Sequence, residues 1–394
     1  MKWYFVIPWY GTHIPGGAEA ECRGAATHLR RAGIEAEVLT TTIQDFLSDW
    51  SKNAYEPGLY EEEGVPVRRF AVQPTYFDIF GYINDRLLRD LKIRPEEESY
   101  FFQEMLRSKD LLSFIEMNGK GSIFIFIPYL FTTTVYGAAI HPERSLLLPC
   151  LHDEPYANLA PVRKTFESCA GILYNVEEER ELANRLYRIA GKPQHVVGIG
   201  LDTDVVGNAD RFRETYRIDA PFILYAGRQD KGKNTHLLVR YFQNFVQSRK
   251  SDLHLVLIGS GGVGIPDSIK DRVHSLGFVP ARDKLDAYRA ATVFCQPSVN
   301  ESFSLVIMES WLQETPVLVH GNCPVTRGHC VRSNGGLYFT NYPEFEETLS
   351  WLLQNEQLRR GMASAGRRYV LANYQWNVVV ERYKTAIRDI FGEA

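Results

Sequence analysis

The chain has 394 residues, of which 45% are hydrophobic, and a formal net charge of -4 at pH 7. This length and apolar content suffice for two domains with their own cores, which excludes a disordered chain and a small stapled scaffold. Acidic and basic residues are interspersed, so the chain has no general field for a polyanion, and we expect no nucleic acid among its partners.

The cysteines and the apolar runs indicate in which cellular compartment the protein is expected. Six cysteines, at positions 22, 150, 169, 295, 323 and 330, show no metal-type pairing, and several lie in apolar strand-like runs. Cysteine in such runs behaves as a small hydrophobe, so we expect a reducing, cytoplasmic environment. The apolar start of the chain stops at Pro8, too early for a signal peptide, and no apolar run reaches membrane-spanning length. Peripheral contact with the inner face of a membrane stays open.

In chain order, the first half alternates strand-like and helix-like runs. Helices are predicted at 18–32 and 131–140, and strands at 3–7, 36–39, 123–127, 146–151 and 172–174. This alternation is typical of doubly wound α/β sheets. The segment 41–118 fits it poorly, being rich in Tyr, Phe and charges, with helix-like stretches around 85–91 and 96–115. We interpret this segment either as acceptor-specific surface or as an ordinary helical subdomain.

Two loops of the first half carry candidate site residues. Gly16 and Gly17 lie in the first strand-to-helix loop, where the backbone could approach a diphosphate or an acceptor, although an ordinary turn would look similar. The apolar run 146–151 delivers His152 and Asp153 to the presumed cleft between the two halves. A loop histidine is more often structural than catalytic.

The alternation returns in the second half. Helices are predicted at 235–247 and 284–291, and strands at 222–226, 253–258, 278–279, 293–296 and 317–319. We therefore predict two Rossmann-like domains, with the join in the glycine-containing, polar stretch that begins at Gly198. The predicted domains are 1–203 and 204–375, followed by a last helix at 376–391.

A basic loop follows the first strand of the second half. Arg228, Lys231 and Lys233 lie where that strand ends, at the edge where open α/β sheets bind ligands. Arg228 and one of the two lysines would neutralise the charge that develops on a departing diphosphate. The alternative is a solvated basic loop without a ligand.

The segment 297–309 is the most informative of the chain. A short buried strand at 292–296 feeds a helix, since Leu305, Met308 and Leu312 recur at helical spacing. Free N–H groups and the positive end of the helix dipole favour a phosphate at such a turn. The hydroxyls of Ser302 and Ser304 add hydrogen-bond donors.

Two carboxylates flank this turn. Glu301 and Glu309 would repel phosphate, and as acceptor-only groups they suit the hydroxyls on either side of a diphosphate. Eight helical residues rise roughly 12 Å, comparable with the span from a transferred sugar to the ribose. Two glutamates eight residues apart also occur by chance.

The segment resembles the E-x(7)-E signature of the retaining glycosyltransferases of family 4, which share the two-domain GT-B fold. The family pattern P-S-x-x-E-G-F-G-L-x-x-x-E-A, followed by G-x-P-V, is matched at Pro297, Ser298, Glu301, Phe303, Leu305, Glu309, Pro316 and Val317. Ser302, Ser304 and Glu314 stand where the family has glycine.

The basic loop resembles the family pattern G-R-L-x-x-x-K-G. The spacing to Leu237 and Leu238 favours Lys233 as the lysine that matches the pattern, and Asn234 then stands in place of the glycine. Lys231 is followed by a glycine, as in the pattern, but this pair lies two residues too early in the chain. The choice between the lysines stays open.

The resemblance implies a set of site residues. The implied catalytic residues are Arg228, Lys233, Glu301 and His152, and the implied donor-binding residues are Gly16, Gly17, Val279, Ser302, Phe303, Ser304, Leu305 and Glu309. Glu301 would orient sugar hydroxyls, Glu309 the ribose, and the two cations the diphosphate, with no metal and no cofactor beyond the nucleotide sugar. His152 would bond the transferred sugar, with Asp153 orienting its ring.

The implied activity is retaining, metal-independent transfer of a hexose from a nucleotide diphosphate sugar to a hydroxyl acceptor in glycan or polysaccharide biosynthesis. UDP-glucose or a related UDP-sugar is the expected donor, and a glycan or lipid-linked glycan the expected acceptor. The resemblance also implies that the last helix, 376–394, crosses back to the first domain.

Two motifs mimic other kinds of site, and two other functions are compatible with the same fold. Asp202-Thr203-Asp204 mimics a metal-binding D-x-D but lies in the predicted linker, and the run 259–264 lacks the capped helix and acidic residue of a dinucleotide site. The alternatives are a nucleotide-sugar epimerase or hydrolase on the same fold, and a non-catalytic glycan-binding protein.

Overall fold

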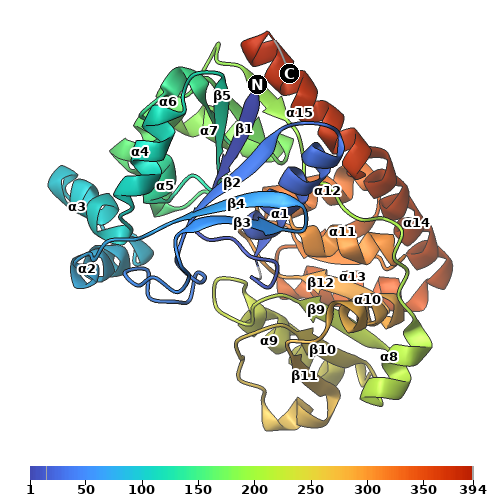
Figure 1. Cartoon of the computed structure of the whole chain (residues 1–394). Helices are drawn as coiled ribbons and strands as arrows, with labels where there is room; N and C mark the ends of the chain where they lie inside the picture. The colour runs from blue at the N-terminus through green and yellow to red at the C-terminus, as the bar shows by residue number, and fades with distance from the viewer. Residues whose placement is uncertain (15, 393–394) are drawn as a thin grey trace. The chain divides into compact units, whose positions relative to one another are not determined.

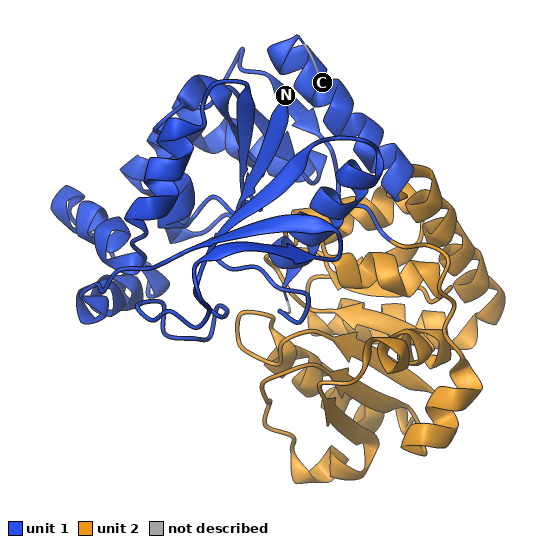
Figure 2. Cartoon of the chain, viewed as in Figure 1, with its two compact units in different colours: residues 1–201, 376–394 blue, residues 202–375 orange. Residues whose placement is uncertain are grey.

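The computed structural model describes residues 1–14 and 16–392, and the chain forms two compact units (Figure 2). Unit 1 holds Met1–Leu201 and Trp376–Ala394, and unit 2 holds Asp202–Gln375. The sequence places the join at about residue 203, in the same stretch. No helix in the described part of the chain has the length and apolar character that a membrane span needs.

Unit 1 is built on an eight-stranded sheet with the order β3-β4-β2-β1-β5-β6-β7-β8, parallel except for the β3–β4 hairpin (Figure 1). The strands are β1 (Lys2–Val6), β2 (Ala36–Thr41), β3 (Gly58–Glu62), β4 (Val65–Phe70), β5 (Ser122–Phe126), β6 (Ser145–Leu147), β7 (Gly171–Tyr174) and β8 (Gln194–Val196). The helices are α1 (Gly17–Arg31), α2 (Phe77–Leu88), α3 (Pro95–Met105), α4 (Lys109–Met117), α5 (Thr132–Gly137), α6 (Ala160–Ser168), α7 (Glu177–Leu186) and α15 (Trp376–Phe391).

Both faces of this sheet are buried. Along β1, Trp3 and Phe5 join one apolar cluster and Tyr4 and Val6 the other, because successive side chains of a strand point to opposite faces. The first cluster includes residues of both α1 and α15. The two helices approach so closely that a Cβ atom added at Gly24 would lie 2.2 Å from the Trp376 ring. The expected return of the last helix to the first domain is therefore confirmed.

The segment 41–118 differs most from the prediction. It contains the β3–β4 hairpin, which was not predicted, and the expected helix 96–115 is two helices, α3 and α4, separated at Leu106–Ser108. Leu106 has an extended backbone, and the Ser108 hydroxyl donates a hydrogen bond of 2.8 Å to the Ala71 carbonyl oxygen. This hydrogen bond to the residue after β4 thus interrupts the segment 96–115, whose apolar periodicity predicts one continuous helix.

Unit 2 is built on a six-stranded parallel sheet with the order β11-β10-β9-β12-β13-β14. Its strands are β9 (Phe222–Ala226), β10 (His254–Ile258), β11 (Val273–Gly277), β12 (Val293–Gln296), β13 (Val317–His320) and β14 (Gly336–Phe339). Its helices are α8 (Ala209–Tyr216), α9 (Thr235–Arg249), α10 (Ala281–Ala290), α11 (Leu305–Leu312), α12 (Pro324–Ser333), α13 (Tyr342–Gln354) and α14 (Glu356–Asn373).

The strand predicted at 278–279 is wrong. The strand β11 ends at Gly277, whose φ of 65° leaves the extended region, and Phe278 is 79% exposed. β11 is an edge strand with mostly half-buried residues, so its own sequence lacks the apolar run that marks an inner strand. The predicted doubly wound architecture is nevertheless confirmed in both units.

Candidate functional site

The order of the unit 2 sheet reverses between β9 and β12. The chain runs from β9 outward to β10 and β11 and then returns to β12 on the other side of β9. In open α/β sheets such a reversal leaves a crevice at the carboxyl ends of the strands, where ligands bind. The loops after β9 and β12 both begin at this point, and the Asn234 amide donates to the Pro297 carbonyl oxygen at 3.1 Å.

An ion pair connects the two loops. Lys233 Nζ lies 2.7 Å from Glu301 Oε1, and the Glu301 side chain is only 9% exposed. The Lys233 backbone N–H also donates to Asp230 Oδ1 at 2.8 Å, which fixes the start of the side chain. Lys231 is exposed. The structure therefore brings Lys233, and not Lys231, to Glu301.

Arg228 lies in the same loop but outside this pair. Its side chain is 55% exposed, and Nε lies 3.4 Å from Asp230 Oδ2. Its backbone carbonyl accepts a 2.6 Å hydrogen bond from the Tyr225 hydroxyl at the end of β9. The backbone is thus anchored, while the guanidinium is exposed and paired only with Asp230 at 3.4 Å among the described residues.

The helix α11 begins later than predicted. Its first residue is Leu305, so Glu301 lies in the loop, and the separation of roughly 12 Å from Glu309, which assumed a continuous helix, does not apply. Ser304, at the N-cap, makes no capping hydrogen bond, and its hydroxyl is buried without a partner among the described residues. The first N–H groups of α11 thus lack a side-chain cap, an arrangement that favours a bound phosphate.

Three residues that replace family glycines share one backbone conformation. Asn234, Ser304 and Glu314 have φ values of 60°, 71° and 58°. This left-handed region is natural for glycine and is tolerated by asparagine, but it costs most other residues about 1–2 kcal/mol. The chain therefore retains a glycine-type backbone at these positions without glycine itself.

Both oxygens of the Glu309 carboxylate have partners on α10. Lys284 Nζ lies 2.7 Å from Oε1, and the Tyr288 hydroxyl donates to Oε2 at 2.9 Å. The two partners lie four residues apart and so share a helix face. Burial, followed by the charge of Glu309, raises the pKa of Tyr288 well above its usual value, so the hydroxyl stays a donor. Sequence reasoning missed both, although both lie in the helix predicted at 284–291.

A third residue that sequence reasoning missed is Gln229. Its backbone N–H donates to the Ser260 carbonyl at 2.7 Å, its carbonyl accepts from Gly262 N–H at 3.1 Å, and its amide donates to the Gly259 carbonyl at 3.1 Å. The glycine-rich loop after β10 is therefore tied to the Arg228 loop. A Cβ atom at Gly259 would lie 2.0 Å from the Gly227 carbonyl oxygen, so this close approach requires glycine.

The other predicted donor-binding residues of unit 2 differ in exposure. Phe303 is 2% exposed, and its ring packs edge-on against His329 and Tyr374 with centroids 5.4 and 5.0 Å away. The buried side chain of Phe303 therefore anchors the loop between β12 and α11. Ser302 and Leu305 are half-buried, and Val279 is buried in the turn before α10.

In unit 1, His152 follows β6 with its side chain 31% exposed. Its expected partner, Asp153, instead binds Arg185 Nη2 at 2.5 Å. The carboxylate facing the ring is Glu154, with Oε1 3.8 Å from His152 Nδ1 and accepting a 2.7 Å hydrogen bond from Tyr129. Burial opposes ionisation of Glu154, but bonding and charge from His152 outweigh it and lower its pKa. The assignment of Asp153 as the orienting group is wrong.

Buried carboxylates support the loop that carries His152. Glu179, in the first turn of α7, accepts from Leu151 N–H at 2.6 Å and from Asn175 N–H at 2.7 Å. Glu21 of α1 accepts from the Asn175 amide at 3.1 Å. Burial raises the pKa of both carboxyls to about 8, and the neighbouring Glu179 adds to the effect on Glu21. The strand ends of β6 and β7 are thus joined through two buried carboxyl groups.

The glycine pair lies at the start of α1. Gly17 opens the helix and has open space where a side chain would begin, whereas a Cβ at Gly16 would meet the Glu19 carboxylate at 1.8 Å. In the described part of the chain, no group of three or more His, Cys, Asp or Glu side chains is placed to hold a metal ion.

Comparison with known proteins gives concordant matches. Residues 208–369 match the family model described as glycosyl transferases group 1. A D-inositol 3-phosphate glycosyltransferase of Xylanimonas cellulosilytica is 27% identical over 64% of this chain and 64% of its own length. That of Kineococcus radiotolerans is 31% identical over 42% of each chain. The chain thus spans less than two thirds of these relatives.

Solved structures share the fold over the whole chain. A sucrose-phosphate synthase of Thermosynechococcus elongatus superposes with a TM-score of 0.74 at 16% identity, covering 100% of both chains. The Anabaena protein HepE in complex with UDP and glucose gives 0.69 at 16% identity, covering 98% of this chain and 99% of its own. From its two units and the solved structures that superpose over the whole chain, we conclude that the chain has the GT-B fold, and that unit 2 is similar to the glycosyl transferases group 1 over residues 208–369.

Proposed function

We propose that the protein transfers a sugar from a nucleotide diphosphate sugar to a hydroxyl acceptor, with retained anomeric configuration and without a metal ion. The observation that carries the proposal is the Lys233–Glu301 ion pair at the reversal of the unit 2 sheet, beside an uncapped helix N-terminus. A cation, free N–H groups and an acceptor-only carboxylate there match a diphosphate with a sugar attached.

In this proposal the protein chiefly positions the two substrates and neutralises the charge of the diphosphate. The diphosphate lies at the start of α11, where Lys233 and the exposed Arg228 offset the charge that builds on the leaving phosphate. Glu301 holds sugar hydroxyls, and Glu309, oriented by Lys284 and Tyr288, holds the ribose. His152 bonds the transferred sugar. The matched motifs offer no nucleophile for the anomeric carbon, so the leaving phosphate deprotonates the acceptor on the same face.

Donor and acceptor are inferred from the printed names of relatives. HepE was solved with UDP and glucose, and a trehalose-6-phosphate protein of E. coli with UDP-2-fluoro glucose, so UDP-glucose or a related UDP-sugar is the proposed donor. The curated relatives are named for D-inositol 3-phosphate, and a structural neighbour for sucrose phosphate. A sugar, a sugar phosphate or a glycan that offers a hydroxyl is therefore the proposed acceptor class.

A lipid-linked acceptor at a membrane surface is the finer proposal. It draws support from exposed apolar side chains in and just before α2, where Tyr76 is 74%, Tyr82 64% and Leu88 68% exposed. Aromatic and aliphatic groups of this kind favour the interface of a bilayer. Co-sedimentation with anionic vesicles, lost in Tyr82→Ser, tests this contact; equal binding of both proteins would reject it.

The function is tested by titrating UDP and UDP-glucose calorimetrically and then following labelled donor with a panel of sugars and sugar phosphates. We expect micromolar to millimolar donor binding and a glycoside that retains the donor configuration by NMR. Release of free sugar without an acceptor would indicate a hydrolase, and a donor epimer would indicate an epimerase. Absence of nucleotide-sugar binding would contradict the proposal.

A further inference from the structure

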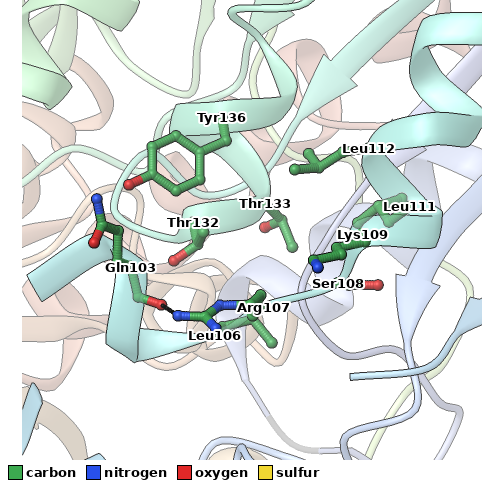
Figure 3. Close-up of a pocket in the computed structure, with 10 residues that line it drawn as sticks. All are labelled: Gln103, Leu106, Arg107, Ser108, Lys109, Leu111, Leu112, Thr132, Thr133 and Tyr136. Atoms are coloured by element: carbon green, nitrogen blue, oxygen red, sulfur yellow. Dashed lines mark hydrogen bonds between the residues drawn. The ribbon is translucent and has the colours of Figure 1, made fainter. Parts of the chain in front are cut away.

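A small pocket in unit 1 shares no residue with the candidate site described above. It has a volume of about 80 Å³ and is enclosed by the end of α3, the start of α4 and the first turns of α5 (Figure 3). A cavity needs roughly 10–15 Å³ of such volume for one water molecule, so there is room for a group the size of a phosphate or a carboxylate. Leu106 and Leu111 form part of its apolar wall.

The pocket adjoins the ligand-binding edge of the unit 1 sheet. The Arg107 carbonyl accepts from Gln73 N–H at 2.9 Å, and Gln73 follows the carboxyl end of β4. At the other end of α4, the Gly121 carbonyl accepts from Lys2 N–H, at the start of β1. The first residue of α4, Lys109, therefore lies at the carboxyl edge of the parallel strands, where α/β sheets receive ligands.

One buried hydroxyl in the pocket has no partner. Thr133 is 3% exposed, lines the pocket, and its Oγ1 makes no hydrogen bond among the described residues. Its neighbours differ: the Thr132 hydroxyl donates to the Phe102 carbonyl at 2.8 Å, and that of Thr134 to the Pro128 carbonyl at 2.6 Å. Buried hydroxyls are normally paired, because leaving one unpaired costs about 1–3 kcal/mol. A bound group in the pocket would supply the missing partner.

Two basic side chains and the Gln103 amide, which can donate or accept, are the other polar groups to consider around the pocket. Arg107 Nη2 bonds Glu104 Oε1 at 3.2 Å and the Gln103 carbonyl at 3.3 Å, which leaves Nε and Nη1 of the guanidinium for another acceptor. Lys109 Nζ is in no ion pair within the described part of the chain, and Figure 3 shows it on the same side of the pocket as Thr133, whereas the Tyr136 hydroxyl points toward Gln103. Two cations against the single carboxylate of Glu104 favour an anion.

We propose that this pocket is a binding site for a small anionic group, a phosphate or carboxylate, held by Lys109, Arg107 and the hydroxyl of Thr133. The group belongs either to the acceptor or to a separate effector. The site shares no residue with the proposed donor site, so anion binding is tested independently of the proposed function, and only the assignment of the anion to the acceptor rests on that function.

Inorganic phosphate is the probe, titrated calorimetrically against the intact chain and its variants. We expect weak saturable binding that falls about 3–10-fold in Lys109→Gln and in Thr133→Val, since each removes one hydrogen-bond donor to an anion. Thr133→Ser keeps the hydroxyl and should retain the affinity, which separates the loss of the donor from altered packing. Lys120→Gln, an exposed lysine beyond the other end of α4, is the matched control.

Phosphate that binds at the proposed donor site would be unaffected by these substitutions. Equal affinity in the wild type, Lys109→Gln and Thr133→Val would therefore overturn the proposal. The source of the anion follows from competition. If Lys109→Gln raises KM for a phosphorylated acceptor and not for its unphosphorylated form, the group belongs to the acceptor. If acceptor kinetics stay unchanged while phosphate affinity falls, the pocket serves a separate effector.

Discussion

Replacing Lys233 by methionine tests the core of the proposed donor site. The substitution keeps the apolar stem and removes the ammonium that lies 2.7 Å from Glu301 Oε1. The remaining hydrogen bond to that oxygen is the Gln296 amide at 3.4 Å, at a side chain that is 9% exposed. Glu301 would thus be left as a nearly buried and poorly compensated carboxylate.

The magnitude follows from these contacts. Removing one partner of a fully buried pair costs about 3–5 kcal/mol. Because the Lys233 side chain is itself 26% exposed and water reaches the pair, we expect the free energy of unfolding to fall by about 1–2 kcal/mol. The effect on turnover should be larger. Loss of a group that stabilises developing charge lowers kcat by ~10²–10³-fold, or about 2.7–4 kcal/mol.

Lys231→Met is the matched control, since Lys231 is an exposed lysine of the same loop. Surface substitutions of this kind change stability by at most about 0.5 kcal/mol, and kcat should change by less than about twofold. Urea denaturation and steady-state kinetics with the donor identified by calorimetry measure both quantities. If Lys231→Met lowers kcat more than Lys233→Met does, or if Lys233→Met stays within about threefold of wild type, the assignment of Lys233 to the diphosphate is refuted.

Three further predictions concern other parts of the structure. Glu309→Ala should weaken UDP binding at least ~10-fold by calorimetry, as a charged hydrogen bond is lost, and unchanged affinity would remove Glu309 from the ribose site. Ser304→Gly should raise the free energy of unfolding by about 1 kcal/mol, because it relieves the left-handed strain and removes an unpaired buried hydroxyl, and a lower melting temperature would contradict this. Glu21 and Glu179 have a pKa of about 8 in the folded state, against 4.5 when exposed. Between these two pKa values the folded state binds more protons than the unfolded state, so the free energy of unfolding should fall as pH rises from about 5 to 8. Glu21→Gln mimics the protonated acid, so the free energy of unfolding, measured by denaturation at pH 5.5 and 8, should depend less on pH in this variant. An unchanged pH dependence would show that Glu21 is not its source.

The elements of the site that lie within one segment were predictable. The buried strand β12, the turn after it and the helix α11 follow from local periodicity, and the pattern from Pro297 to Val317 carries the resemblance to family 4. The exact start of α11 was not predictable, because Ser304 takes a left-handed backbone that periodicity does not reveal. The same limit applies to Leu106, where bonding to another segment divides a helical run into α3 and α4.

The partners of the predicted residues could not be read from the chain. His152 has two carboxylates within two positions, and nothing local decides that Asp153 turns to Arg185, 32 residues away, while Glu154 faces the ring. Likewise, Tyr288 occupies an ordinary helical position until the packing of α10 brings it to Glu309.

The sequence by itself determined the class of fold, the resemblance to a family and the residue types of the loops after β9 and β12, since strand and helix periods and short motifs are local properties of a chain. Only the tertiary structure decided which residues meet. Lys233 and Glu301 lie 68 positions apart and touch because β9 and β12 are neighbours in the sheet. The order of strands arises from how whole elements bury their apolar faces together, and no single segment carries that information.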